Sequence, residues 1–256
     1  MFPISRLPTR TAALACAAAV IGTVQATAGA APNCTAQSAA AITPVVELYT
    51  SEGCHSCPPA DRWISSLKGE PGVVALAFHV DYWDRLGWKD RFASPAYTQR
   101  QAQQQQSNGA RFSYTPQVVL NGIDRPQWHS QPAPNVVRER APAKVDILLT
   151  RDGRQLQAQV RALPGAPARL AAYWAVSENG HGTAVKAGEN QGEILKHDFV
   201  VRQYAPVAPW NAVAGEAMAI RFDADLSNAA GTPTEVNLVV IDAATRRPVQ
   251  AVKLGC

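Results

Sequence analysis

The chain has 256 residues, of which 46% are hydrophobic and 17% charged, so it is long enough for two domains and is neither a disordered tail nor a collagen-like fibre. Its 24 lysines and arginines exceed its 20 aspartates and glutamates only slightly, and these charges are scattered. Because nucleic-acid binding needs a concentrated basic surface, we expect no nucleic-acid partner.

The first 30 residues have the pattern of a secretory signal peptide. Arg6 and Arg10 provide a positive start, residues 12–24 are apolar, and small residues at 26–30 provide a cleavage site. The apolar stretch is shorter than the roughly 20 residues that a membrane-spanning helix requires, so we expect no transmembrane segment after cleavage. The pattern predicts a periplasmic or secreted protein.

Beyond a leader over residues 31–43, residues 44–142 predict alternating strands and helices. The expected elements are a strand (45–49), a helix (58–68), an almost continuously apolar strand (72–80), a helix (94–107) and a strand (117–120) that ends at a hairpin turn. A strand, a crossover helix and a parallel strand form the βαβ unit of an α/β domain.

Residues 143–256 have a different pattern, with turn signals at regular spacing and no convincing helix. The expected strands are residues 144–150, 155–162, 169–177, 193–203, 216–223, 235–241 and 248–254. Seven such strands are typical of an antiparallel β-sandwich.

Cys54 and Cys57 lie between the first strand and its helix, with two residues between them. A cysteine at a helix N-terminus becomes a thiolate more readily, and the thiolate attacks disulfides or binds metal ions. We therefore expect Cys54 to act as the nucleophile and Cys57 to resolve the mixed disulfide, with no cofactor. An imidazolium at His55 would stabilise the thiolate. The alternative is an inert structural disulfide.

Two further residues are candidates for the same chemistry. Pro116 begins a strand where, in a thioredoxin-like fold, a cis-proline packs against the dithiol and leaves the backbone of Thr115 available to an extended substrate. An ordinary trans proline is the alternative. Glu47 interrupts an apolar strand, and a buried acid there could accept the proton of Cys57. It could equally face solvent or form a salt bridge.

Aromatic residues between positions 82 and 92, including Trp83 and Trp88, could form a platform for an unfolded substrate or could pack in the core. His79 ends the second strand at the edge where α/β sheets bind ligands, so it is either a functional residue or a structural one. His197, on a strand beside an acid, is interpreted as structural.

Four cysteines remain if Cys16 is removed with the signal peptide. When Cys54 pairs with Cys57, the other two are Cys34 and Cys256, near the two ends of the mature chain. Disulfides persist outside the cytoplasm, and the ends of a domain often lie close together. We expect Cys34 and Cys256 to form a structural disulfide.

Several segments together resemble the secreted thioredoxin-like family called domain of unknown function 1223. They are residues 46–61, 79–84, 86–90, 114–117, 188–190 and 197–198. The resemblance implies a thioredoxin-like domain with Cys54 and Cys57 as its dithiol and Pro116 as its cis-proline. The expected fold is an α/β thioredoxin-like domain over residues 44–142, followed by an all-β sandwich-like domain over residues 143–256.

The leading functional hypothesis is a thiol-disulfide oxidoreductase that acts on protein or peptide thiols and disulfides and is restored by a redox-recycling partner. A second hypothesis is a copper-handling protein, because soft thiolates select Cu(I), with Cys54, Cys57 and either His55 or His79 as ligands. A third is a non-enzymatic binding module that docks a partner through its β-sandwich.

Overall fold

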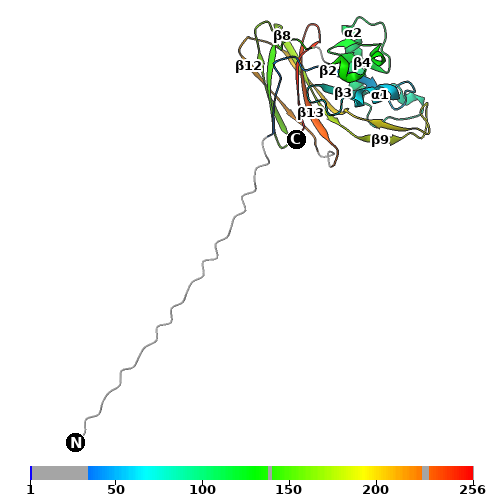
Figure 1. The fold of residues 1–256 in the computed structure, drawn as a ribbon, viewed down its shortest axis with the longest axis horizontal. Coiled ribbons are helices and arrows are strands. Elements are labelled where there is room, and N and C mark those ends of the chain that lie inside the picture. Colours follow the sequence, from blue (N-terminus) through cyan, green and yellow to red (C-terminus); the bar gives the residue numbers. More distant parts are fainter. Residues whose placement is uncertain (2–33, 138–139, 227–230, 256) are drawn as a thin grey trace. The chain divides into compact units, whose positions relative to one another are not determined.

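The computed structural model describes Met1 and residues 34–137, 140–226 and 231–255 (Figure 1). The expected signal peptide, residues 1–30, lies outside the described residues apart from Met1. Residues 34–255, where described, belong to one compact unit. In the described part of the chain, no helix has both the length and the apolar character needed to cross a membrane.

A central mixed sheet of eight strands joins the two halves of the chain. Its strands are, in spatial order, β14 (Pro248–Leu254), β13 (Thr234–Asp242), β8 (Arg169–Glu178), β11 (Val200–Asn211), β3 (Val74–His79), β2 (Val45–Thr50), β4 (Gln117–Leu120) and β5 (Ile123–Asp124). β2 and β3 are parallel, and β4 is antiparallel to β2. The two halves meet where β3 pairs in parallel with β11, with Ala77 opposite Val200.

A smaller antiparallel sheet and one separate hairpin complete the β structure. The smaller sheet contains β1 (Cys34–Gln37), β6 (Val145–Asp152), β7 (Gln155–Ala162) and β12 (Ala217–Asp223). The hairpin consists of β9 (His181–Ala184) and β10 (Ile194–His197). Among the described strands, β9 and β10 pair only with each other. The hairpin therefore depends on side-chain and loop contacts for its position.

Helices and the smaller sheet cover the two faces of the central sheet. The helices are α1 (Pro58–Ser65), α2 (Pro95–Ser107), α3 (Ala133–Val136) and the short 3-10 helices η1 (Asp84–Leu86) and η2 (Trp128–Ser130). Side chains alternate along a strand, so neighbouring residues of β8 face opposite layers. Trp174 stacks on Phe222 of β12, whereas Tyr173 lies under the guanidinium of Arg100 from α2. α2 thus covers one face, while α1, α3 and the smaller sheet cover the other.

The expected fold class is wrong: the chain is not an α/β thioredoxin-like domain followed by a separate β-sandwich. Strands expected in the two domains share one hydrogen-bonded sheet, and Ala77 N donates to the Phe199 carbonyl at 2.8 Å where they join. The physical reason is that both edges of β3 need a hydrogen-bonded partner strand. This strand is buried and apolar, and its second edge would be unpaired in a domain that ended near residue 142.

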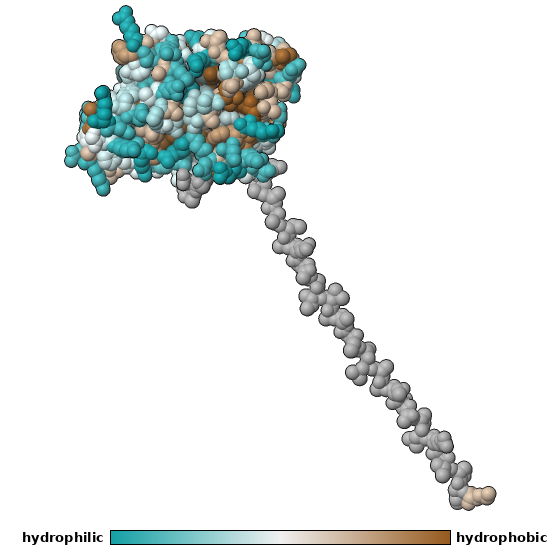
Figure 2. Space-filling view, turned by 180° about the vertical axis from the view of Figure 1, so that it is seen from behind, coloured by the Kyte–Doolittle hydropathy of each residue, from teal (hydrophilic) through white to brown (hydrophobic). Residues whose placement is uncertain are grey.

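Individual elements agree better with the sequence pattern than the overall fold does. The expected helix at 94–107 is α2, with the Ser94 hydroxyl accepting a hydrogen bond from Ala96 N as an N-cap. The expected strand at 193–203 is instead two strands, β10 and β11, separated at Phe199, which has a positive φ of 58°. On the face shown in Figure 2, hydrophilic residues are the most numerous, and hydrophobic residues gather in one region.

Candidate functional site

Cys54 and Cys57 form a disulfide at the start of α1, with a Cα–Cα distance of 5.4 Å. The pair follows the carboxyl end of β2, and α1 begins at Pro58 and Pro59, where a missing N–H breaks no helical hydrogen bond. Both cysteines have 0% exposed surface. The geometry of a dithiol at a helix N-terminus is therefore present, but other residues cover the sulfur atoms.

The predicted cis peptide bond between Thr115 and Pro116 is confirmed. It places the Thr115 hydroxyl 3.3 Å from the sulfur of Cys54, within hydrogen-bond distance. The Thr115 carbonyl oxygen lies 3.5 Å from the Ser56 hydroxyl. The structure thus brings together the dithiol and the residues that the sequence assigns to substrate binding at this position.

Trp83 and Trp88 form part of the wall around the dithiol loop. Trp83 Nε1 donates to the Thr115 hydroxyl at 2.8 Å, and Trp88 Nε1 donates to Glu52 Oε2 at 2.8 Å. Both indoles are partly buried, so these residues combine the packing role and the site-forming role that the sequence left open. His55 is exposed on the same loop.

Glu47 lies away from the dithiol. Its carboxylate accepts hydrogen bonds from Tyr49, Arg100, Gln104 and Tyr173, all on the α2 face of the sheet. The neighbouring side chains of β2 face α1 instead, because side chains alternate along the strand. The structure does not bring Glu47 to Cys57, and the salt-bridge alternative describes its position.

The charge of Glu47 shifts the pKa values of the side chains around it. Burial, followed by the charge of Glu47, raises the pKa of Tyr49 well above its usual value. Burial lowers the pKa of Arg100, but the charge of Glu47 outweighs that effect and raises it well above the usual value. The Glu47–Arg100 pair is therefore a buried, hydrogen-bonded salt bridge between β2 and α2.

Five buried side chains lie on the elements around the dithiol, and we call them the acid–histidine cluster: Glu52, Asp61, His79, Asp90 and His197. Each is at most 5% exposed. His197 Nε2 is 3.5 Å from Glu52 Oε1, and His197 Nδ1 is 3.9 Å from Asp61 Oδ1. His79 Nδ1 is 2.6 Å from Asp90 Oδ2, and the two histidine rings are 4.9 Å apart.

Three members of the cluster, His197, Asp90 and Glu52, have shifted pKa values. Burial lowers the pKa of His197, but interactions with Asp61 and Glu52 outweigh burial and raise the pKa to about 9. Burial raises the pKa of Asp90, but the charge and hydrogen bond of His79, with two backbone N–H groups, lower it to about 2. Interactions with His197, Thr183 and Trp88 outweigh burial and lower the pKa of Glu52. A positive His197 between two carboxylates is the expected state at neutral pH.

Sequence reasoning missed the cluster as a group, although signals for part of it exist. Asp61 lies four residues after Cys57, which places both on one side of α1. Glu52 lies two residues before Cys54. His197 comes from β10, more than one hundred residues away, so its position cannot be read from local spacing. In the described part of the chain, no group of three or more His, Cys, Asp or Glu side chains is arranged to hold a metal ion.

The loop between β9 and β10 contacts the backbone on both sides of Cys54. Asn190 Nδ2 donates to the carbonyl oxygens of Glu52 at 2.9 Å and Cys54 at 3.0 Å. Glu189 Oε2 accepts the backbone N–H of His55 at 3.1 Å. These hydrogen bonds join the loop to both sides of Cys54.

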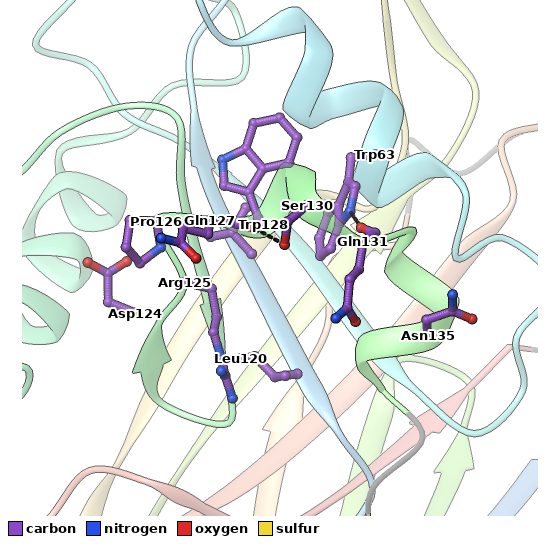
Figure 3. Close-up of a pocket in the computed structure, with 11 residues that line it drawn as sticks. Trp63, Leu120, Asp124, Arg125, Pro126, Gln127, Trp128, Ser130, Gln131 and Asn135 are labelled. Atoms are coloured by element: carbon purple, nitrogen blue, oxygen red, sulfur yellow. Dashed lines mark hydrogen bonds between the residues drawn. The ribbon is translucent and has the colours of Figure 1, made fainter.

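Two cavities flank α1. One of about 420 Å³ contains Trp63 of α1 and Trp128, whose rings meet edge to face, and Trp63 Nε1 donates to the Gln131 carbonyl (Figure 3). None of the residues expected in the site lines this cavity. The other, of about 370 Å³, lies between α1 and β10 and is lined by His55 and Asn190. Only the second cavity adjoins the dithiol loop.

Cys34 begins β1, which pairs with β6 of the smaller sheet. Its expected partner, Cys256, lies outside the described residues. The Cys34–Cys256 disulfide therefore stays a prediction.

Comparison with known proteins places the chain in a family. Residues 45–241 match the family described as "Protein of unknown function (DUF1223)", and the chain belongs to it. The chain is also similar to a protein of Agrobacterium tumefaciens whose crystal structure was determined as a structural genomics target. The two are 27% identical, with a TM-score of 0.61 over 84% of this chain and 94% of that one. A search of curated proteins found no significant match.

Proposed function

We propose that this protein is a thiol-disulfide oxidoreductase that acts on protein or peptide substrates through Cys54 and Cys57. The observation that carries the proposal is the disulfide at the N-terminus of α1, with the Thr115 hydroxyl 3.3 Å from the sulfur of Cys54. A helix N-terminus favours the thiolate, and a hydroxyl donor at the same sulfur adds to that preference.

In the reduced protein, the Cys54 thiolate attacks one sulfur of a substrate disulfide. A mixed disulfide forms, and the first substrate sulfur leaves as a thiolate and takes up a proton. Cys57 then loses its proton and attacks the sulfur of Cys54, which releases the second substrate sulfur. Two electrons pass from the dithiol to the substrate, and a redox-recycling partner restores the starting state.

In this proposal a member of the acid–histidine cluster, and not Glu47, accepts the proton of Cys57. Asp61 N donates to the Cys57 carbonyl at 3.2 Å, and the Asp61 carboxylate lies buried between Thr50 and His197. We assign Asp61 as the group that receives the Cys57 proton during resolution.

We also propose that the protein works in the periplasm or outside the cell. The pattern of residues 1–30 supports export, and a dithiol that cycles through a disulfide suits an oxidising compartment.

The proposal can be tested with the mature chain in its reduced form. It should reduce insulin disulfides or a fluorescent peptide disulfide, and the Cys54→Ser variant should lose this activity. The Cys57→Ser variant should accumulate mixed disulfides with its substrates, which mass spectrometry can identify. Equal activity of the wild-type chain and the Cys54→Ser, Cys57→Ser double variant would overturn the proposal.

A further inference from the structure

Polar contacts flank the dithiol at both the tip and the base of the β9–β10 hairpin, which also contacts Arg91, Phe92 and α1. At its tip, Asn190 and Glu189 bind the backbone of residues 52–55. At its base, His197 lies between Glu52 and Asp61. Among the strands that the structure describes, none of either larger sheet pairs with the hairpin. Its closed position therefore depends on side-chain and loop contacts.

The disulfide that these contacts flank is shielded from solvent. Cys54 and Cys57 have no exposed surface, although the residues between them, His55 and Ser56, are exposed. Thiol-disulfide exchange requires the attacking sulfur to reach a disulfide sulfur directly. A substrate or recycling partner cannot reach either sulfur in this conformation.

We propose that the β9–β10 hairpin is a gate over the Cys54–Cys57 pair, closed by Asn190, Glu189 and His197, and that exchange with any partner requires it to open. The purpose of the gate rests on the proposed function, but its effect on access to the disulfide can be tested separately. Opening would widen the cavity between α1 and β10 and make room there for an extended peptide.

Gly188 in the loop and His197 at the base of the hairpin are relevant to opening of the gate. Gly188 has a φ of +75°, which favours glycine, and a Cβ atom built there would lie 3.2 Å from the Cβ of Trp88. The polar atoms at the base are incompletely satisfied, because neither ring nitrogen of His197 has a hydrogen bond within normal distance. The polar contacts of the closed state are therefore the hydrogen bonds of Asn190 and Glu189 and the long ion pairs of His197, beside the buried side chains of Val185 and Leu195.

The test measures how fast dithiothreitol reduces the Cys54–Cys57 disulfide in the mature chain. Two electrons and two protons pass to the cysteines as dithiothreitol becomes its cyclic disulfide. Samples are quenched with acid and alkylated, and the peptide that contains both cysteines is quantified by mass spectrometry. This readout needs no substrate, so it distinguishes failure of the gate from failure of the oxidoreductase proposal.

Asn190→Ala removes the two hydrogen bonds that Asn190 donates and leaves that of Glu189. It should increase the rate of reduction about tenfold, because a buried hydrogen bond contributes roughly 1 kcal/mol net. Gly188→Ala should also increase the rate, because its methyl group would push the loop away from Trp88. The matched control is Asn237→Ala, another buried asparagine whose amide bonds Ala175 and Ser177 in the central sheet. It should lower stability without changing the rate.

Circular dichroism and urea unfolding establish that each variant is folded. Folded Asn190→Ala and Gly188→Ala variants that are both reduced at the wild-type rate would overturn the gate. A rate increase of the same size in Asn237→Ala would also overturn it, because the effect would then reflect general destabilisation. Fast reduction of the gate variants without any activity on peptide disulfides would support the gate and contradict the oxidoreductase proposal.

Discussion

The hydroxyl oxygen of Thr115 lies 3.3 Å from the sulfur of Cys54. In the reduced protein this hydroxyl would donate to the Cys54 thiolate, because a hydrogen bond to the charged form of a group favours that form. Trp83 orients the same hydroxyl through its indole N–H. The contact joins the start of β4 to the start of α1 and leads to the first prediction.

Thr115→Val should shift the pH profile of Cys54 alkylation to higher pH and slow alkylation near pH 7 by roughly tenfold, because it removes one charge-assisted hydrogen bond. Iodoacetamide labelling of the reduced chain over a range of pH measures this effect. Thr150→Val on β6 is the control, since its hydroxyl bonds only the Gln157 carbonyl in the smaller sheet. An unchanged profile in Thr115→Val would show that the hydroxyl does not stabilise the thiolate.

Glu47→Gln should lower the free energy of unfolding by about 3 kcal/mol, because it leaves the buried Arg100 guanidinium without its charged partner. It should leave the pH profile of the dithiol unchanged, since Glu47 lies on the opposite face of the sheet from α1. Urea unfolding measures the first effect, and the alkylation assay measures the second. A shifted dithiol profile in a folded variant would restore the role that the sequence suggested for Glu47.

Asp61→Asn should slow resolution of a mixed disulfide at Cys54 by roughly tenfold or more, because it removes the proposed acceptor of the Cys57 proton. The effect should diminish at high pH, where Cys57 loses its proton to solvent. Stopped-flow mixing of a preformed mixed disulfide measures the rate across pH. Asp223→Asn, at an exposed ion pair with Arg154, provides the control. A pH-independent slowing in Asp61→Asn would indicate a structural effect instead.

Stability should fall as the pH rises from about 6.5 to about 9. The pKa of His197 is raised to about 9 in the folded protein from an unfolded value near 6.5. The protonated His197 therefore stabilises the fold fully below pH 6.5, and this stabilisation is lost as the pH rises to about 9. The facing groups are Glu52 on the loop before α1, Asp61 on α1 and His79 on β3.

Urea unfolding at pH 6, 7.5 and 9 measures this loss. The His197→Gln variant should be less stable at pH 6 and should show a flatter dependence on pH in this range. If the wild-type chain and His197→Gln lose stability in parallel, another group is responsible for the change.

The features that could be predicted from sequence are those set by neighbouring residues. The spacing of Cys54 and Cys57, the two prolines that follow and the turn before them define the start of a helix with a dithiol. The pairing of β3 with β11 could not be predicted, because Ala77 and Val200 are far apart in the chain. The pattern of apolar residues in each strand is also compatible with two separate domains as well as with one shared sheet.

The site divides in the same way. The sequence shows Glu47 as an acid in an apolar strand. Alternation along β2 places it on the face away from α1. The sequence does not show which face of the sheet α1 covers, so the side on which Glu47 lies is known only from the structure. Asn190 and His197 belong to a hairpin whose contact with the dithiol loop depends on tertiary packing. Polar residues in a loop of this kind have no periodicity that would distinguish a cover from an ordinary surface turn.

The pairing of Ala77 with Val200 has a consequence for how the protein is made. A ribosome that has released residues 44–142 has produced the whole dithiol segment, but one edge of β3 still has no partner. That edge must wait until β11 has been synthesised, and contacts of such long sequence separation form slowly. The loop that contains Asn190 is also synthesised later, so its hydrogen bonds to Glu52 and Cys54 form only after that point. Folding helpers that protect exposed strand edges would matter most during this interval.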